Sequence, residues 1–173
     1  MEIITQSALE TQNLGEKMGR DLKNKVLPKA GSYLGLDKLG PRILCLYGEL
    51  GSGKTTFIQG VAKGLGIKKR VISPTFMFIR QYEIRNTQYV SRFTSHLSHF
   101  YHVDLYRINK VKEARDLGLE EIFKDSQAVV AIEWAEKAKE ILPKRRIDIY
   151  FDYISENQRK IRIKNEALFQ DYK

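Results

Sequence analysis

One glycine-rich segment constrains the fold of this chain more than any other feature. Its sequence is Gly48-Glu49-Leu50-Gly51-Ser52-Gly53-Lys54-Thr55, which fits the phosphate-binding loop, or P-loop, pattern G-x-x-x-x-G-K-[ST]. A continuous apolar run at 43–47 precedes the loop, and apolar residues at helical spacing follow it over 57–65. Because such a loop functions between a buried strand and the start of a helix, the sequence predicts strand, loop and helix in that order.

The residue types of this loop suit a triphosphate that is bound together with Mg²⁺. Gly48, Gly51 and Gly53 allow closely spaced backbone N–H groups to point inward without Cβ clashes. A helix that begins near Lys54 adds the positive end of its dipole. Lys54 is placed to neutralise β- and γ-phosphate oxygens, and the Thr55 hydroxyl is a candidate Mg²⁺ ligand.

Two carboxylates follow apolar runs, where neighbouring strands of a sheet would end. Glu133 follows the run 128–132, and Asp104 follows a shorter strand-like segment. A lone strand-end acid more often faces solvent, but Mg²⁺ beside a P-loop usually takes one further contact from such a carboxylate. The hydroxyls of Ser73 and Thr75 either approach the γ-phosphate as a switch loop or belong to an ordinary turn, and the sequence leaves both interpretations open.

Three histidines, His96, His99 and His102, recur at intervals of three residues. On a strand this spacing places neighbours on opposite faces, and no cysteine or carboxylate cluster in the sequence completes a zinc shell. We therefore expect these histidines at surface positions or against phosphate. Trp134, which follows Glu133, is expected to be a packing residue at the sheet edge, with base stacking as the alternative.

The formal net charge of +9 is concentrated in one part of the chain. Residues 61–112 contain ten basic and two acidic side chains, interleaved with aromatic residues. Two interpretations remain open for this basic region. It is either a solvated surface over inward-packed strand aromatics or a surface that contacts a nucleic acid.

Length and composition predict one globular domain over residues 1–173, with 42% hydrophobic and 29% charged residues. No apolar run reaches the roughly 18 residues of a spanning helix, and the first ten residues contain neither a basic leader nor an apolar core. The single cysteine, Cys45, excludes an intrachain disulfide. We expect a cytoplasmic protein without membrane contact.

Hydrophobic periodicity predicts the remaining elements and the fold class. The elements are a helix over 8–26 that starts with a capping box at 7–10, β-hairpins over 76–106, short helical turns over 111–124, a buried strand at 128–132, and strands with one solvated face at 147–151 and 161–163. The predicted class is α/β, a three-layer P-loop NTPase-like fold. Its central sheet is mostly parallel, with antiparallel strands from 76–106 and 147–163 and helices on both faces.

Several segments, taken together, carry a family resemblance that runs nearly from end to end. Besides GELGSGKTTF, they are Thr11-Gln12-Asn13-Leu14-Gly15, Ser73-Pro74-Thr75-Phe76, His102-Val103-Asp104-Leu105-Tyr106-Arg107, Leu117-Gly118-Leu119-Glu120-Glu121 and Ile132-Glu133-Trp134-Ala135-Glu136. In this order and spacing they resemble the bacterial TsaE family, small P-loop ATPases of tRNA threonylcarbamoyladenosine (t6A) biosynthesis.

The resemblance implies ATP binding, slow ATP hydrolysis, Mg²⁺ held by Thr55 and Glu133, and an essential acid at Asp104. The expected nucleotide-binding residues are Thr11, Gly48, Glu49, Leu50, Gly51, Ser52, Gly53, Lys54, Thr55 and Thr56, with Lys54 and Asp104 as the catalytic pair. The implied partners are TsaB and TsaD, of which TsaD transfers the threonylcarbamoyl group to adenosine 37 of tRNA. The basic region 61–112 is then a candidate tRNA contact.

Three departures from the family pattern stand out. Ala135 replaces the usual proline of EWPE, Glu49 stands where Asp is commoner, and the stretch 84–98 is longer and more basic than the usual hairpin.

Two other functions remain alternatives on the sequence. One is a small-molecule P-loop kinase, which shares the size and the loop, and the other is a nucleic-acid-binding module whose P-loop is inert.

Overall fold

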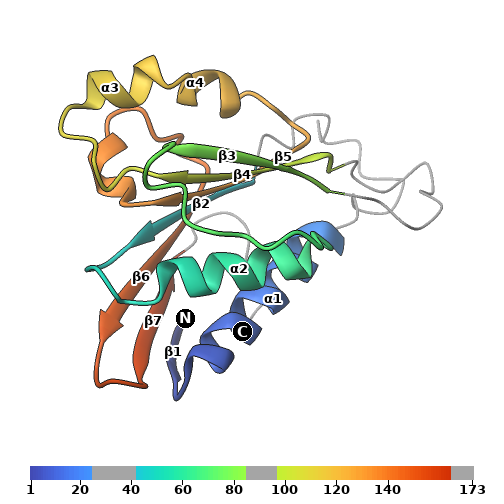
Figure 1. Cartoon of the computed structure of the whole chain (residues 1–173), viewed down its shortest axis with the longest axis vertical. Helices are drawn as coiled ribbons and strands as arrows, with labels where there is room; N and C mark the ends of the chain where they lie inside the picture. The colour runs from blue at the N-terminus through green and yellow to red at the C-terminus, as the bar shows by residue number, and fades with distance from the viewer. Residues whose placement is uncertain (25–41, 85–96, 165–173) are drawn as a thin grey trace.

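A mixed β-sheet forms the centre of the protein (Figure 1). The computed structural model describes residues 1–24, 42–84 and 97–164. The strands are β1 Glu2–Thr5, β2 Arg42–Tyr47, β3 Ile79–Glu83, β4 His99–Asp104, β5 Ala128–Glu133, β6 Ile147–Tyr153 and β7 Arg159–Lys164. Within the described residues they are ordered β1-β7-β6-β2-β5-β4-β3.

The four central strands, β6, β2, β5 and β4, are parallel to one another, and the outer strands pair antiparallel. Every residue of β5 is buried, and so are the first five residues of β2, as continuous apolar runs predict for strands covered on both faces. Strand β6 alternates between buried and half-buried residues, as predicted for a strand with one solvated face.

Helices cover both faces of this sheet, which confirms the predicted three-layer α/β fold (Figure 1). They are α1 Ala8–Asn24, α2 Lys54–Gly64, α3 Val111–Asp116, α4 Leu119–Ile122 and the 3₁₀ helix η2 Ala135–Ala138. One hydrophobic core lies between the sheet and α1 with α2, and a second lies under α3, α4 and η2. The described helices include none with the length and apolarity needed to cross a bilayer.

Helix α1 packs against α2 with direct backbone contact, because glycines line the interface. A Cβ atom added at Gly60 would lie 2.0 Å from the carbonyl oxygen of Gln12, and one added at Gly15 would lie 2.1 Å from that of Phe57. Only residues without a Cβ permit this approach. The contact holds the first turn of α1, including Thr11, beside the P-loop, where a Cβ at Gly53 would lie 3.7 Å from Thr11 Cγ2.

Two elements differ from the sequence predictions. Strand β1 was not predicted; it pairs with β7, whose residues lie more than 150 positions later in the sequence. Residues 76–78 were predicted to be β-structure but belong to a turn, in which the N–H groups of Met77 and Phe78 both donate to the carbonyl of Pro74. Phe78 has a φ of 61°, so strand β3 starts only at Ile79.

Two further predictions, for strand β4 and for the capping box of α1, agree with the structure in part. Strand β4 forms the predicted antiparallel pair with β3, but it also pairs parallel with β5 and is therefore part of the sheet centre. Ser7 Oγ accepts a hydrogen bond from the Glu10 N–H, as a capping box requires, whereas the Glu10 carboxylate accepts from Gln6 and not from Ser7. The predicted end of helix 8–26 and most of the stretch 84–98 lie outside the described residues.

The helix interface leads to a prediction about stability. We expect Gly60→Ala to lower the free energy of unfolding by about 1–3 kcal/mol, because the added methyl group forces the two backbones apart. Alanine otherwise stabilises a helix interior by about 0.5–1 kcal/mol relative to glycine, so a loss isolates the clash. Urea denaturation measures the effect, with Asn13→Ala on the exposed side of α1 as the control. Equal stability of Gly60→Ala and wild type would contradict the interpretation.

Candidate functional site

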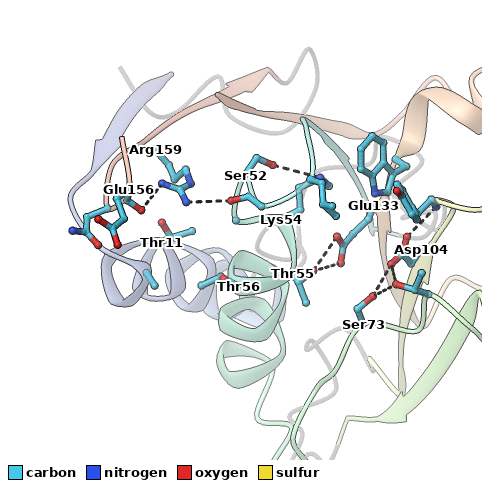
Figure 2. A pocket seen from close by; sticks show the side chains of 18 residues that line it. Thr11, Ser52, Lys54, Thr55, Thr56, Ser73, Asp104, Glu133, Glu156 and Arg159 are labelled. Atoms are coloured by element: carbon cyan, nitrogen blue, oxygen red, sulfur yellow. Dashed lines mark hydrogen bonds between the residues drawn. The ribbon is translucent and has the colours of Figure 1, made fainter. Parts of the chain in front are cut away.

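A pocket of about 440 Å³ opens where the central parallel strands end (Figure 2). Its lining residues come from α1, the P-loop, α2, the 73–75 segment, the ends of β4 and β5, and the hairpin between β6 and β7. They are Ala8, Thr11, Leu50, Gly51, Ser52, Gly53, Lys54, Thr55, Thr56, Ser73, Thr75, Asp104, Tyr106, Glu133, Trp134, Glu156, Asn157 and Arg159. Gly48 and Glu49, which were predicted to bind nucleotide, are not among them.

The backbone of the P-loop has the conformation that its glycines predict. Gly48, Gly51 and Gly53 have φ values of 142°, 77° and 98°, a region that residues with a Cβ rarely adopt. Gly53 is the N-cap of α2 and provides no side-chain oxygen for the first N–H groups of the helix. These N–H groups are therefore available to an anion in the pocket.

Lys54 is a buried cation directed into the loop. Its Nζ donates hydrogen bonds to the carbonyls of Gly48 (2.6 Å) and Glu49 (2.9 Å), and it lies 4.3 Å from the centroid of the Trp134 ring. Burial lowers the pKa of Lys54 below its usual 10.5, while nearby carboxylates, Glu133 the strongest, act in the opposite direction. A polyanion in the pocket would favour the charged form in the same way as these carboxylates.

Glu133 and Thr55 meet across the boundary between sheet and helix. The Thr55 hydroxyl donates to Glu133 Oε1 at 2.8 Å and Oε2 at 3.0 Å, and Glu133 is only 4% exposed. Both are oxygen donors of the kind that Mg²⁺ prefers. The described residues contain no group of three or more His, Cys, Asp or Glu side chains that could hold a metal alone. The pair therefore fits Mg²⁺ bound jointly with phosphate oxygens, which is how this ion is usually held in nucleotide sites.

Asp104 holds the 73–75 segment at the other side of the pocket. Its Oδ2 accepts hydrogen bonds from Ser73 Oγ and Thr75 Oγ1, both at 2.6 Å, and its Oδ1 accepts from the N–H of Tyr106 at 3.0 Å. Asp104 is paired with Glu133 in the parallel register of β4 and β5, so the two acids stand side by side. The two hydroxyls therefore line the pocket together with the acid, a position that suits a switch loop.

Arg159 is a pocket residue that the sequence analysis missed, as are Ala8, Glu156 and Asn157. From β7 it donates to the carbonyl of Gly51 (3.1 Å) and to the carbonyls of Ser155, Glu156 and Gln158. It lies with Thr11 and Glu156 across the P-loop from Asp104 and Ser73 (Figure 2). No sequence signal identifies Arg159, because its role in the loop depends on contacts between residues more than 100 positions apart.

The prediction for the histidines is wrong for His102. Its side chain is fully buried, and its Nε2 lies 2.9 Å from Glu133 Oε1. His99 contacts Asp125 at 2.8 Å, and His96 lies outside the described residues. Trp134 packs beside Tyr106, with ring centroids 5.2 Å apart, and also lines the pocket.

The basic region 61–112 contributes polar side chains to the pocket but no lysine or arginine among its described residues. Lys68, Lys69 and Arg70 are exposed, and the Arg107 guanidinium lies 4.1 Å from the ring centroid of Phe76, which is 79% exposed. Phe100, by contrast, is fully buried.

Comparisons with known proteins agree on one family. A model of the family described as Threonylcarbamoyl adenosine biosynthesis protein TsaE matches residues 5–161. The chain is 40% identical over 119 residues to the tRNA threonylcarbamoyladenosine biosynthesis protein TsaE of Bacillus subtilis, covering 69% of this chain and 66% of that protein, just under two thirds of its length. It is 29% identical to the Treponema pallidum protein of the same description, covering 94% and 99%.

A solved structure is similar to this chain in fold. The crystal structure of Bacillus subtilis YdiB superposes with a TM-score of 0.62 and 27% sequence identity. The superposition covers 93% of this chain and 82% of that one.

The contacts of Arg159 generate a prediction about the P-loop. We expect Arg159→Leu to speed amide hydrogen exchange of the described loop residues 49–53, because the guanidinium no longer ties Gly51 to the β6–β7 hairpin. The matched control is Lys160→Leu, which removes a surface ion pair with Glu2 from the same strand. Exchange in the loop that is equally fast in both variants would contradict the assignment.

Proposed function

Because this chain belongs to the TsaE family of threonylcarbamoyladenosine biosynthesis proteins, we propose that it binds ATP with Mg²⁺ at the P-loop and hydrolyses it slowly in support of t6A formation. The observation that carries this proposal is the contact between Thr55 and Glu133 beside Lys54, at the carboxyl ends of the parallel strands. This combination places a cation, two oxygen ligands and uncapped helix N–H groups at one point of the pocket.

The proposed roles follow from these positions. Lys54 and the backbone N–H groups of the loop stabilise charge on the β- and γ-phosphate oxygens. Mg²⁺, when bound by Thr55, Glu133 and the nucleotide, neutralises further charge on those oxygens. Asp104 lies in the pocket with its carboxylate fixed by Ser73, Thr75 and the Tyr106 N–H, where it is placed to orient or deprotonate an attacking water.

The positions of these residues indicate the orientation in which the nucleotide lies in the pocket. Lys54, Thr55 and Asp104 define the end for the terminal phosphate, so the nucleoside is proposed to lie toward Thr11 and Arg159. Thr11 is held there by a hydrogen bond of 2.8 Å between its hydroxyl and that of Thr5. We also include Thr56, which lines the pocket, among the nucleotide contacts, as well as the backbone of Gly48 and Glu49 through Lys54.

The proposed orientation of the nucleotide also supports slow ATP turnover. Arg159 is the arginine among the described pocket residues, and it lies at the nucleoside end. An arginine that reaches the terminal phosphate accelerates P-loop enzymes by about 10³–10⁵-fold. We propose TsaB and TsaD as the partners that complete the site, with the exposed cations of the basic region available to tRNA.

Nucleotide binding and turnover of two variants test the proposed function. We expect Lys54→Ala to weaken binding of a fluorescent ADP analogue with Mg²⁺ at least about tenfold, because a charge-assisted contact is lost. Asp104→Asn should retain this binding and lose most ATP turnover. Titration and phosphate release measure the two effects. Wild-type affinity in Lys54→Ala would indicate an inert loop, and transfer of phosphate to an added small molecule would indicate a kinase.

Partner dependence gives a second test. Purified TsaB and TsaD should raise ATP turnover of this chain by about tenfold or more, because the isolated pocket has no described arginine at the terminal phosphate. Phosphate release is measured with and without the pair, using Lys54→Ala as the background control. Equal turnover in both mixtures would contradict the proposed partnership.

A further inference from the structure

His102 stands out among the buried polar residues because the function proposed above does not use it. It is 0% exposed, on the central strand β4, and its imidazole makes one hydrogen bond, from Nε2 to Glu133 Oε1 at 2.9 Å. The other nitrogen, Nδ1, is buried and has no hydrogen-bond partner among the described residues. Burying an imidazole with only one of its two nitrogens paired costs free energy that an apolar side chain would avoid.

The sheet explains how this contact forms. His102 is paired with Ala131 in the parallel register of β4 and β5, and Asp104 is paired with Glu133. His102 and Glu133 are therefore diagonal neighbours on the face of the sheet that packs against α2. The small side chain of Ala131, fully buried opposite His102, leaves room for the imidazole to reach toward the carboxylate.

Hydrogen-bond chemistry fixes the roles of the two groups. As a metal ligand Glu133 must be ionised, and an ionised carboxylate only accepts hydrogen bonds, so in that form Nε2 carries the proton and donates to Glu133. The Thr55 hydroxyl contacts both oxygens of this carboxylate, at 2.8 Å and 3.0 Å, and does not distinguish between them. His102 contacts Oε1 alone. Among the described residues, His102 is therefore the donor that distinguishes the two oxygens. Its hydrogen bond restrains rotation of the carboxylate plane.

We propose that His102 is a positioning residue for the metal: by holding Oε1 of Glu133, it keeps the carboxylate oriented so that Oε2, which among the described residues accepts a hydrogen bond only from the Thr55 hydroxyl, faces Mg²⁺ or a water bound to it. This inference rests on the proposed binding of ATP with Mg²⁺. Residues that orient a metal ligand from behind commonly change metal affinity by about 10–100-fold when they are replaced. The effect should therefore appear in metal binding and not in the metal-free affinity for the nucleotide.

Two amide variants separate positioning from packing. In His102→Gln the amide nitrogen can occupy the position of Nε2 and donate to Glu133, whereas in His102→Asn it lies nearer the position of Nδ1 and falls short. Mn²⁺ binding to the full chain with ADP, measured by electron paramagnetic resonance, is the readout. We expect His102→Gln to stay within about threefold of wild type and His102→Asn to bind Mn²⁺ about 10–100-fold more weakly. ADP affinity in excess chelator should be the same in all three proteins.

The Mn²⁺ affinities of these variants decide whether His102 positions Glu133. Wild-type Mn²⁺ affinity in His102→Asn, or equal losses in the two variants, would overturn the positioning role. If His102→Asn does not fold, as judged by thermal unfolding, His102→Leu replaces it, because leucine removes both nitrogens without placing an amide in the core. If neither of these variants folds, His102→Gln decides the matter. Mn²⁺ affinity within about threefold of wild type supports the positioning role, and a larger loss overturns it. Failure of the wild-type protein to bind ADP with Mn²⁺ would instead refute the proposed function.

Discussion

Parallel pairing of β2, β5 and β4 is the constraint on which the rest of this protein depends. In a parallel sheet all carboxyl ends meet at one edge, so the loop after β2 and the acids that end β4 and β5 must lie together. The registers make this placement specific, since Glu133 is paired with Leu46 on one side and with Asp104 on the other. The pocket forms at this edge, where the backbone of the loop turns into α2.

A group of buried polar residues collects at the same edge. Lys54, His102, Asp104 and Glu133 are each at most 4% exposed. Burying charged groups is costly unless they are paired and hydrogen-bonded, and here each carboxylate has hydrogen-bond donors and the ammonium group has carbonyl acceptors. These hydrogen bonds hold the side chains in defined orientations, which favours binding because little ordering remains to be done.

The opposite end of the pocket is assembled from the two ends of the chain. Helix α1 reaches it through glycine contacts with α2, and β1 pairs with β7 to bring the Arg159 region alongside. The guanidinium of Arg159 then ties the hairpin between β6 and β7 to the carbonyl of Gly51. The P-loop is thus supported from both sides, by the parallel strands and by this hairpin.

The sequence by itself determined what depends on neighbouring residues: the P-loop with its positive-φ glycines, the buried strands β2 and β5, the three-layer fold, and Thr55, Asp104 and Glu133 as candidates. Tertiary structure alone decided which distant residues meet. The burial of His102 behind Glu133, the contact of Arg159 with Gly51, and the edge strand β1 all depend on register and pairing across the sheet. Local periodicity carries no information about these contacts, because a strand pattern shows which face is buried and not which strand lies beside it.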